Sequence, residues 1–245
     1  MPLCKLCKTE AKLVEAHIIP RAFYQLSDTD EPVKIVSSVE GEHPRRMRIG
    51  IYDPNILCAK CDGALGLLDQ HAAETLLPPG TPISSLAGGP ALCQYDRADP
   101  VLIHHFVASV YWRASVSSHS FFRRVRLGPY EDRIADLLND PAKQHGSEIE
   151  TVLGEFNSDR VPILDPCPNK WGAVRVWTLY ANRFVLYFKT DQRPSPDDMS
   201  QHVLRKGAPV RTWVRDWLSS KERAAMVPLA RRHPNLYKPR SRDER

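Results

Sequence analysis

Apolar and polar residues follow a pattern that predicts several short strands and one helix in the first third of the chain. A strand is expected near 12–19, and the runs VKIVSSV and RMRIGIY, at 33–39 and 46–52, have the character of strands. Apolar residues then recur at helical spacing, at Leu65, Leu68, Ala72 and Leu76. This spacing predicts a helix that begins around 59–62 and ends near 77, where the sequence PPG stops it.

The remainder of the chain predicts three helices and a hairpin. Residues 101–118 are apolar nearly all round, which is typical of a buried helix, and 129–140 form a shorter amphipathic helix. The segment 173–190 contains two β-branched and aromatic runs separated at 181–183, which predicts a hairpin with Asn182 at positive φ. Residues 209–220 are predicted to be helical because five apolar residues fall on one face: Val210, Trp213, Val214, Trp217 and Leu218.

These elements predict an α+β protein in four parts. Residues 1–77 form one compact N-terminal unit, and residues 78–100, which are rich in Pro and Gly, form a linker or a long loop. Residues 101–227 form a mixed unit of helices and a β-hairpin whose role the sequence does not reveal. Residues 228–245 form a basic tail that is expected to be flexible.

Composition places the chain among ordinary globular proteins. Its 245 residues are 42% hydrophobic and 26% charged, which is enough to bury a real core. No apolar run approaches the roughly 18 residues that a membrane span requires. The N-terminus MPLCKLC lacks the regions of a secretory signal. We therefore expect a cytoplasmic protein with no membrane partner.

The net charge of +5 favours a polyanionic partner only slightly. Its distribution is more informative, because arginines gather at 45–48, at 123–126 and in the last segment. Solvated surface charge is the simplest explanation of any one cluster. Four arginines near the candidate site in sequence are nevertheless candidate phosphate contacts: Arg21, Arg45, Arg46 and Arg48.

Four of the six cysteines form two C-x2-C pairs, Cys4 with Cys7 and Cys58 with Cys61. Two such pairs supply the four thiolates of a tetrahedral zinc ion, and a closed set of this kind is typical of a structural site. The alternative is four unrelated buried thiols. We expect a structural zinc ion that ties two distant segments of the chain together.

A zinc ion at these cysteines would also bring three other polar side chains into one neighbourhood. His17 follows the first pair by ten residues, Asn55 precedes the second pair by three, and Asp62 follows it directly. An imidazole can deprotonate water, an amide can orient a loop or a base, and a carboxylate can hold a divalent ion. These three groups together suit metal-assisted hydrolysis.

The segments CKLC, EAHIIPR and NILCAKCD resemble the motif of HNH endonucleases, also called ββα-metal nucleases, in the form with a structural zinc. The family pattern is C-x2-C, then an acidic residue or histidine followed by His-x-x-Pro, and later Asn shortly before a second C-x2-C. The resemblance covers residues 4–62 and the helix to about 77. It implies an N-terminal zinc-bound ββα element, followed by the mixed helix and hairpin unit.

The resemblance also implies a role for each motif residue. His17 corresponds to the general base that activates water, Asn55 to the asparagine that shapes the loop and supports the histidine, and Asp62 to a ligand of the catalytic metal. The implied cofactors are structural Zn²⁺ and a catalytic divalent ion, Mg²⁺ or Mn²⁺. The implied substrate is a phosphodiester bond in nucleic acid, with DNA favoured over RNA.

The chain departs from the family pattern at the ligands of the catalytic metal. Ala16 stands directly before His17, where the family usually has a metal-binding Asp or His, and Glu15 is expected on the other face of the strand. Asp69 lies about 10 Å further along the helix than Asp62. In the simpler interpretation His17 is a packing residue beside the cysteines, and Asp62 is an acid that counters the helix dipole.

Three functional hypotheses follow. The first is a metal-dependent endonuclease with His17 as the base. The second is a catalytically inactive, zinc-stapled module that binds nucleic acid or protein, for example as part of a phage-defence system, and Ala16 is its best support. The third places the function in residues 101–245, as a domain that binds a protein partner.

Overall fold

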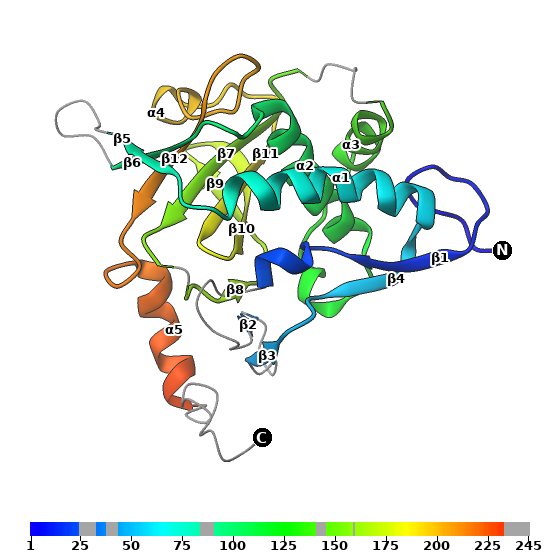
Figure 1. Cartoon of the computed structure of the whole chain (residues 1–245), viewed down its shortest axis with the longest axis horizontal. Helices are drawn as coiled ribbons and strands as arrows, with labels where there is room; N and C mark the ends of the chain where they lie inside the picture. The colour runs from blue at the N-terminus through cyan, green and yellow to red at the C-terminus, as the bar shows by residue number, and fades with distance from the viewer. Residues whose placement is uncertain (25–32, 38–43, 84–90, 141–145, 159, 233–245) are drawn as a thin grey trace.

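The structure is a computed structural model that describes residues 1–24, 33–37, 44–83, 91–140, 146–158 and 160–232. Over these ranges the chain is mixed α+β, with five α-helices and three β-sheets (Figure 1). No helix in them combines the length and the hydropathy that a membrane crossing needs. The helices are α1 (Ala59–Leu76), α2 (Pro100–Val116), α3 (Tyr130–Asn139), α4 (Asp197–Ser200) and α5 (Lys221–Arg232), with short 3-10 helices η1 (Arg21–Tyr24) and η2 (Ser120–Phe122).

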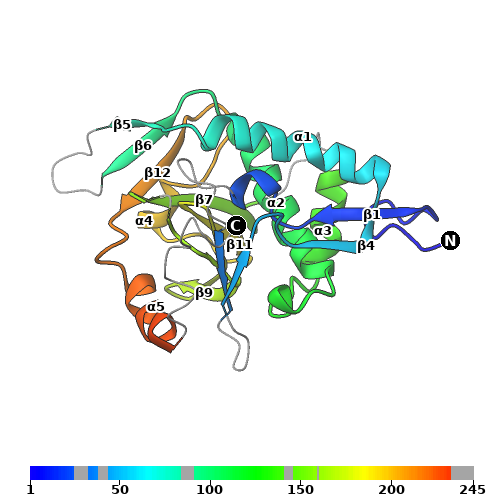
Figure 2. The same ribbon diagram turned by 60° about the horizontal axis from the view of Figure 1, so that its bottom comes forward.

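The N-terminal part contains an antiparallel pair of strands, β1 (Leu13–His17) and β4 (Tyr52–Cys58), and β4 leads directly into α1. The predicted strand near 12–19 and the predicted helix to about 77 are therefore confirmed. In α1 the buried residues Leu65, Ala72 and Leu76 recur at helical spacing and form its inner face. Figure 2 shows α1 running alongside both strands.

The predicted strand at 46–52 is split between two strands in the structure. Its first part belongs to β3 (Arg45–Met47), which pairs with β2 (Val33–Val36), and its last residue, Tyr52, begins β4. Gly50 between them has a φ of 91°, a conformation that residues with a Cβ rarely adopt. The chain therefore turns between the small sheet, which β8 (Ile163–Leu164) completes, and the β1–β4 pair.

The largest sheet has seven strands in the order β5-β6-β12-β7-β11-β10-β9. The predicted hairpin is confirmed and lies between β7 and the edge strand β9, with β10 (Val174–Ala181) and β11 (Phe184–Thr190) antiparallel and Asn182 at a φ of 56°. The other strands are β5 (Thr81–Ile83), β6 (Leu92–Tyr95), β7 (Ile149–Phe156), β9 (Cys167–Trp171) and β12 (Val210–Arg215).

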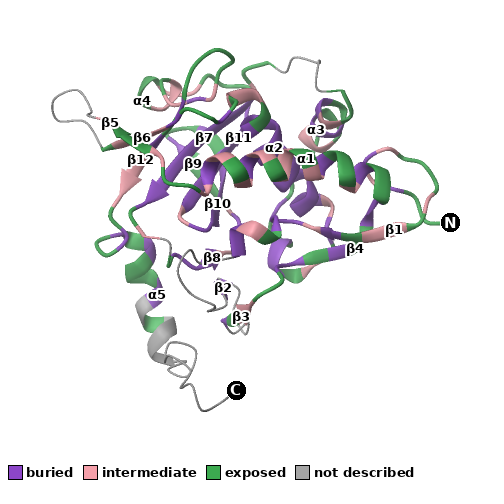
Figure 3. Ribbon diagram, in the orientation of Figure 1, coloured by how far each residue is buried: buried purple, intermediate pink, exposed green. Residues whose placement is uncertain are grey.

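Helix α2 occupies the centre of the molecule, between α1 and strands β7 and β11 (Figures 1 and 3). It begins where the Asp99 carboxylate accepts hydrogen bonds from the N–H groups of Val101 and Leu102. Every residue from 103 to 115 is buried. This confirms the prediction of a buried helix at 101–118, and α3 likewise confirms the amphipathic helix at 129–140.

The segment 209–220 was predicted to be helical, and this prediction is wrong. Its first residues form β12, which pairs with β6 on one side and with β7 on the other. Val210 and Thr212, two residues apart, are fully buried, which is the period of a strand. The apolar residues of this short run fit both periods, and pairing on both edges selects the strand because its backbone groups are then satisfied.

Residues 78–100 also differ from the expected linker or long loop. They contain β5 and β6, which pair with each other and extend the seven-stranded sheet through β12. Of the predicted tail at 228–245, residues 228–232 belong to α5, and 233–245 lie outside the described residues. One hydrophobic cluster includes buried residues from both sides of residue 78, as in the stack of Phe23 on Phe106 at 5.4 Å.

Arg183, in the turn of the β10–β11 hairpin, holds the C-terminal end of α1. Its guanidinium donates to the carbonyls of Leu76 at 2.7 Å, Pro78 at 2.9 Å and Leu77 at 3.0 Å. These are carbonyls that the end of a helix leaves without a partner, and a cation there is favoured by the helix dipole. The same guanidinium lies 3.9 Å from the buried carboxylate of Glu155, so α1 is joined to the sheet.

We predict that Arg183→Ala lowers the free energy of unfolding by about 3 kcal/mol, because it leaves the Glu155 carboxylate and the helix carbonyls uncompensated. Chemical denaturation followed by circular dichroism measures the change. Arg175→Ala, at an exposed position on the neighbouring strand β10, is the matched control and should change stability by less than about 0.5 kcal/mol. Equal losses in the two variants would contradict the anchoring role of Arg183.

Candidate metal centre and catalytic site

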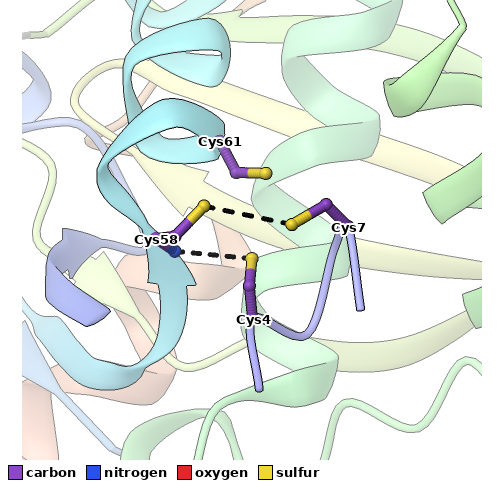
Figure 4. Close-up of side chains that lie close together, drawn as sticks. All are labelled: Cys4, Cys7, Cys58 and Cys61. Atoms are coloured by element: carbon purple, nitrogen blue, oxygen red, sulfur yellow. Dashed lines mark hydrogen bonds between the residues drawn. The ribbon is translucent and has the colours of Figure 1, made fainter. Parts of the chain in front are cut away.

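The four paired cysteines converge at one end of the β1–β4 pair. Cys4 and Cys7 lie in the turn before β1, Cys58 is the last residue of β4, and Cys61 lies in the first turn of α1. Their four sulfur atoms all lie within 4.8 Å of one another, and the sulfurs of Cys7 and Cys58 are 4.0 Å apart (Figure 4). The figure shows the four side chains pointing toward a common centre.

This arrangement fits a tetrahedral metal ion. A zinc ion with Zn–S bonds of about 2.3 Å requires sulfurs about 3.8 Å apart, which is close to the observed spacing. Burial and the neighbouring thiols raise the pKa of Cys61, whereas hydrogen bonding by Thr9 lowers the pKa of Cys7 to about 6. Four thiolates this close repel one another unless a cation lies between them. The cluster can therefore bind a structural metal such as zinc.

The turn that carries Cys4 and Cys7 is built by its own backbone. Lys8 donates its N–H to the carbonyl of Cys4 at 2.9 Å, and Lys8 itself has a φ of 57°. Two side-chain contacts then fix the turn against the rest of the molecule. Lys5 Nζ donates to the carbonyl of Val116 at the end of α2, at 2.6 Å, and Asn139 of α3 donates to the carbonyl of Leu6.

We predict that Cys58→Ala loses the bound metal and lowers Tm by at least about 10 °C, because structural zinc contributes several kcal/mol to folding. Metal analysis of the purified protein, together with thermal unfolding, measures both effects. Cys93→Ala removes a thiol outside the cluster and should leave the metal content unchanged. Retention of zinc by Cys58→Ala would contradict the assignment of the cluster.

His17 is the last residue of β1 and lies at the surface of the β1–β4 pair, half-buried. Its Nε2 atom lies 2.8 Å from the carbonyl oxygen of Ile49. A carbonyl can only accept, so this contact assigns the proton to Nε2 and leaves Nδ1 with a lone pair. The imidazole is thus held in the tautomer that a general base requires.

Asp62 and Asp69 lie two helical turns apart on α1, and the pKa of Asp62 is raised above its usual value. Burial raises the pKa of Asp62; the Arg113 cation lowers it, the Asp69 carboxylate raises it and His17 lowers it. These influences are electrostatic and require proximity. His17 and Asp62, 45 residues apart in the chain, therefore lie within electrostatic range of each other.

Arg113, from α2, contacts both β1 and α1, and it was not identified as a site residue from the sequence. Its Nη atoms donate to both oxygens of Asp69, at 2.7 and 2.8 Å, and to the backbone carbonyl of His17, at 2.8 Å. Ser109 accepts the remaining donors through its carbonyl and its hydroxyl. All five N–H groups of a guanidinium are thereby used. With 1% of its side chain exposed, Arg113 fastens β1 to α1 and has no donor left for a ligand.

Asn55 is exposed, in the irregular part of β4 where the register with β1 shifts. The hydrogen bond that holds the His17 ring comes from Ile49 and not from Asn55. The backbone N–H of Asn55 donates to Asp53, a buried carboxylate that also accepts from Ser117 and Ser118 after α2. Asp53, which sequence reasoning also missed, thus ties β4 to α2.

The other candidate residues divide into buried and exposed ones. Ala16 is fully buried, and Glu15 is exposed. Apart from the cysteines, the residues that the structure describes contain no group of three or more His, Cys, Asp or Glu side chains placed to hold a metal ion. Three of the candidate phosphate contacts, Arg21, Arg45 and Arg48, are exposed, and Arg46 is partly buried.

Comparison of the chain with models of protein families, with curated proteins and with solved structures found no match. The function is therefore inferred from the chemistry of the site and from the motif resemblance alone.

We predict that Arg113→Ala lowers the free energy of unfolding by about 3–5 kcal/mol, because it leaves the Asp69 carboxylate without its cation. The double variant Arg113→Met with Asp69→Leu should recover most of this loss, since no charge is then left unpaired. Denaturant unfolding measures both. A double variant as unstable as the single one would contradict an ion-pair origin.

Proposed function

We propose that the protein is an endonuclease that hydrolyses phosphodiester bonds in nucleic acid, with His17 as the general base. The observation that carries this proposal is the His17 imidazole, held through Nε2 by the Ile49 carbonyl, left with a lone pair on Nδ1 and within electrostatic range of Asp62. The resemblance of the three segments to the HNH motif supports it. The antiparallel strands β1 and β4, followed directly by helix α1 with the cysteine cluster at their junction, support it further.

The proposed reaction uses the free nitrogen of His17. Nδ1 accepts a proton from a water molecule, the water oxygen attacks the phosphorus, and the bond to the leaving sugar oxygen breaks. The leaving oxygen takes a proton from solvent. The hydrogen bonds of the His17 ring to Ile49 and of its backbone carbonyl to Arg113 keep the base in place during this transfer.

A divalent cation, Mg²⁺ or Mn²⁺, would supply charge stabilisation at the phosphate in this site. Asp62 is the carboxylate that would hold it, because Asp69 already has both oxygens bonded to Arg113. One carboxylate suits Mg²⁺, which commonly keeps several waters and completes its shell with substrate phosphates. The lack of a second protein ligand also favours the second candidate function, a binding module without a catalytic ion, because the Ala16 side chain has no ligand atom.

We predict that His17→Ala lowers kcat/KM for nucleic-acid cleavage by roughly 10²- to 10⁴-fold, the usual contribution of general base catalysis. Cleavage of labelled DNA and RNA in Mg²⁺ and in Mn²⁺ measures it. Zinc content should not change, and Tm should fall by only a few degrees, since one hydrogen bond is lost.

His71→Ala is the matched control for this variant. The Nε2 atom of His71 accepts a hydrogen bond from the N–H of Asp99 at the start of α2, so its loss also removes one contact. His71→Ala should lose a similar amount of stability and retain full cleavage. If the wild type binds nucleic acid without cutting it, and His17→Ala binds equally well, the binding module is the correct function.

A further inference from the structure

Two large apolar side chains are exposed on the segment that contacts the candidate base. Ile49 is 57% exposed and Tyr52 is 40% exposed. Most large hydrophobic residues of the described chain are inside, and the other exposed ones lie elsewhere in the sequence: Met1, Leu3, Leu67, Leu102 and Leu218. Ile49 provides the carbonyl that holds His17, and Tyr52 is the residue directly opposite His17 in the β1–β4 pair. The apolar surface therefore adjoins the imidazole itself.

The segment that exposes these two side chains is rigidly anchored. Gly50 packs against the ring of Tyr24 so closely that a Cβ would lie 2.6 Å from its Cε2 atom. Ile51 donates its N–H to the hydroxyl of Tyr24 at 3.1 Å and accepts from the N–H of Ile18 at 3.0 Å. Tyr24 is fully buried, so its ring is enclosed by packing. The backbone thus holds the Ile49 and Tyr52 side chains outward, on both sides of the buried residues Gly50 and Ile51.

The ring of Tyr52 shares a face of the strand pair with His17. Residues directly opposite each other on antiparallel strands project to the same side, and the two ring centroids are 6.1 Å apart. The opposite face of the pair is buried, as Ala16 and Asp53 show. Arg48, which is exposed, precedes Ile49 and adds a positive charge at the edge of the same segment. An apolar ring beside a cation and a general base matches a nucleotide, which has a flat base and an anionic phosphate.

We propose that residues 48–52, the substrate platform, bind one unstacked nucleobase next to the scissile phosphate, with Tyr52 and Ile49 in contact with the base. The substrate class is therefore single-stranded nucleic acid. This inference rests on the proposed function, since it places the phosphate at His17. A base in an intact duplex has both faces covered by its neighbours and cannot stack on Tyr52, whereas a single strand presents its bases freely.

The experiment compares cleavage and binding of one sequence as single-stranded DNA, single-stranded RNA and duplex DNA. Wild type, Tyr52→Phe and Tyr52→Ala are tested with the full chain, and binding is measured by fluorescence anisotropy both without divalent ions and in Ca²⁺. Tyr52→Ala should raise KM and Kd for a single strand by roughly 5- to 150-fold, the range of base–aromatic stacking, with duplex DNA changed less than about 2-fold. Tyr52→Phe keeps the ring and should behave as wild type. Leu218→Ala, at another exposed apolar residue, is the control.

The outcomes separate this inference from the proposed function. Cleavage of single strands and duplex at equal rates, or an equal effect of Tyr52→Ala on both, overturns the platform and leaves the nuclease intact. Binding of single strands that depends on Tyr52 without any cleavage supports the platform and overturns the nuclease. Absence of binding to all three nucleic acids overturns both.

Discussion

The position of the candidate site depends on the convergence of four cysteine sulfurs from two distant segments of the chain. Without that junction, the strand pairing of β1 with β4 would be the main connection between the start of β1 and the start of α1, and a two-stranded pair is marginally stable in water. A metal such as zinc bound between the sulfurs would add an interaction stronger than many hydrogen bonds. His17 at the far end of β1 and Asp62 in the first turn of α1 inherit their relative position from this junction.

The buried ion pair of Arg113 and Asp69 makes a second junction, at the end of β1 away from the cysteines. A buried charge is tolerated only where every donor has a partner, and Arg113 meets this condition by bonding to Asp69, to Ser109 and to the backbone of His17. Because Arg113 belongs to α2, the residues after 100 contribute to the geometry around His17. The C-terminal part is thus a scaffold for the candidate site, which is a role that the domain division by composition did not suggest.

Sequence reasoning identified the elements and residues whose signal is local. The cysteine pairs, the helix after the second pair and the hairpin at Asn182 have short-range patterns that a single sequence displays. Arg113 had a weaker signal, since an arginine in an otherwise apolar helix must be paired, but its partner Asp69 is 44 residues away. The carbonyl of Ile49 that holds His17 has no signal at all, because any residue supplies a carbonyl. The segment 209–220 was assigned to the wrong element because its period was ambiguous over few residues.

Under the proposed function, the burial of Ala16 determines how a catalytic ion is held. The side of β1 from which the family usually supplies a ligand is closed here, so the protein would hold the ion from α1 alone, through Asp62. An ion with one protein carboxylate needs phosphate oxygens to complete its shell, so ion and substrate would bind together. In that arrangement the scissile phosphate would be positioned mainly by the protein surface that holds the nucleotide, and less by the ion. A rigid segment beside the base, anchored on Tyr24, has the stiffness that this task requires.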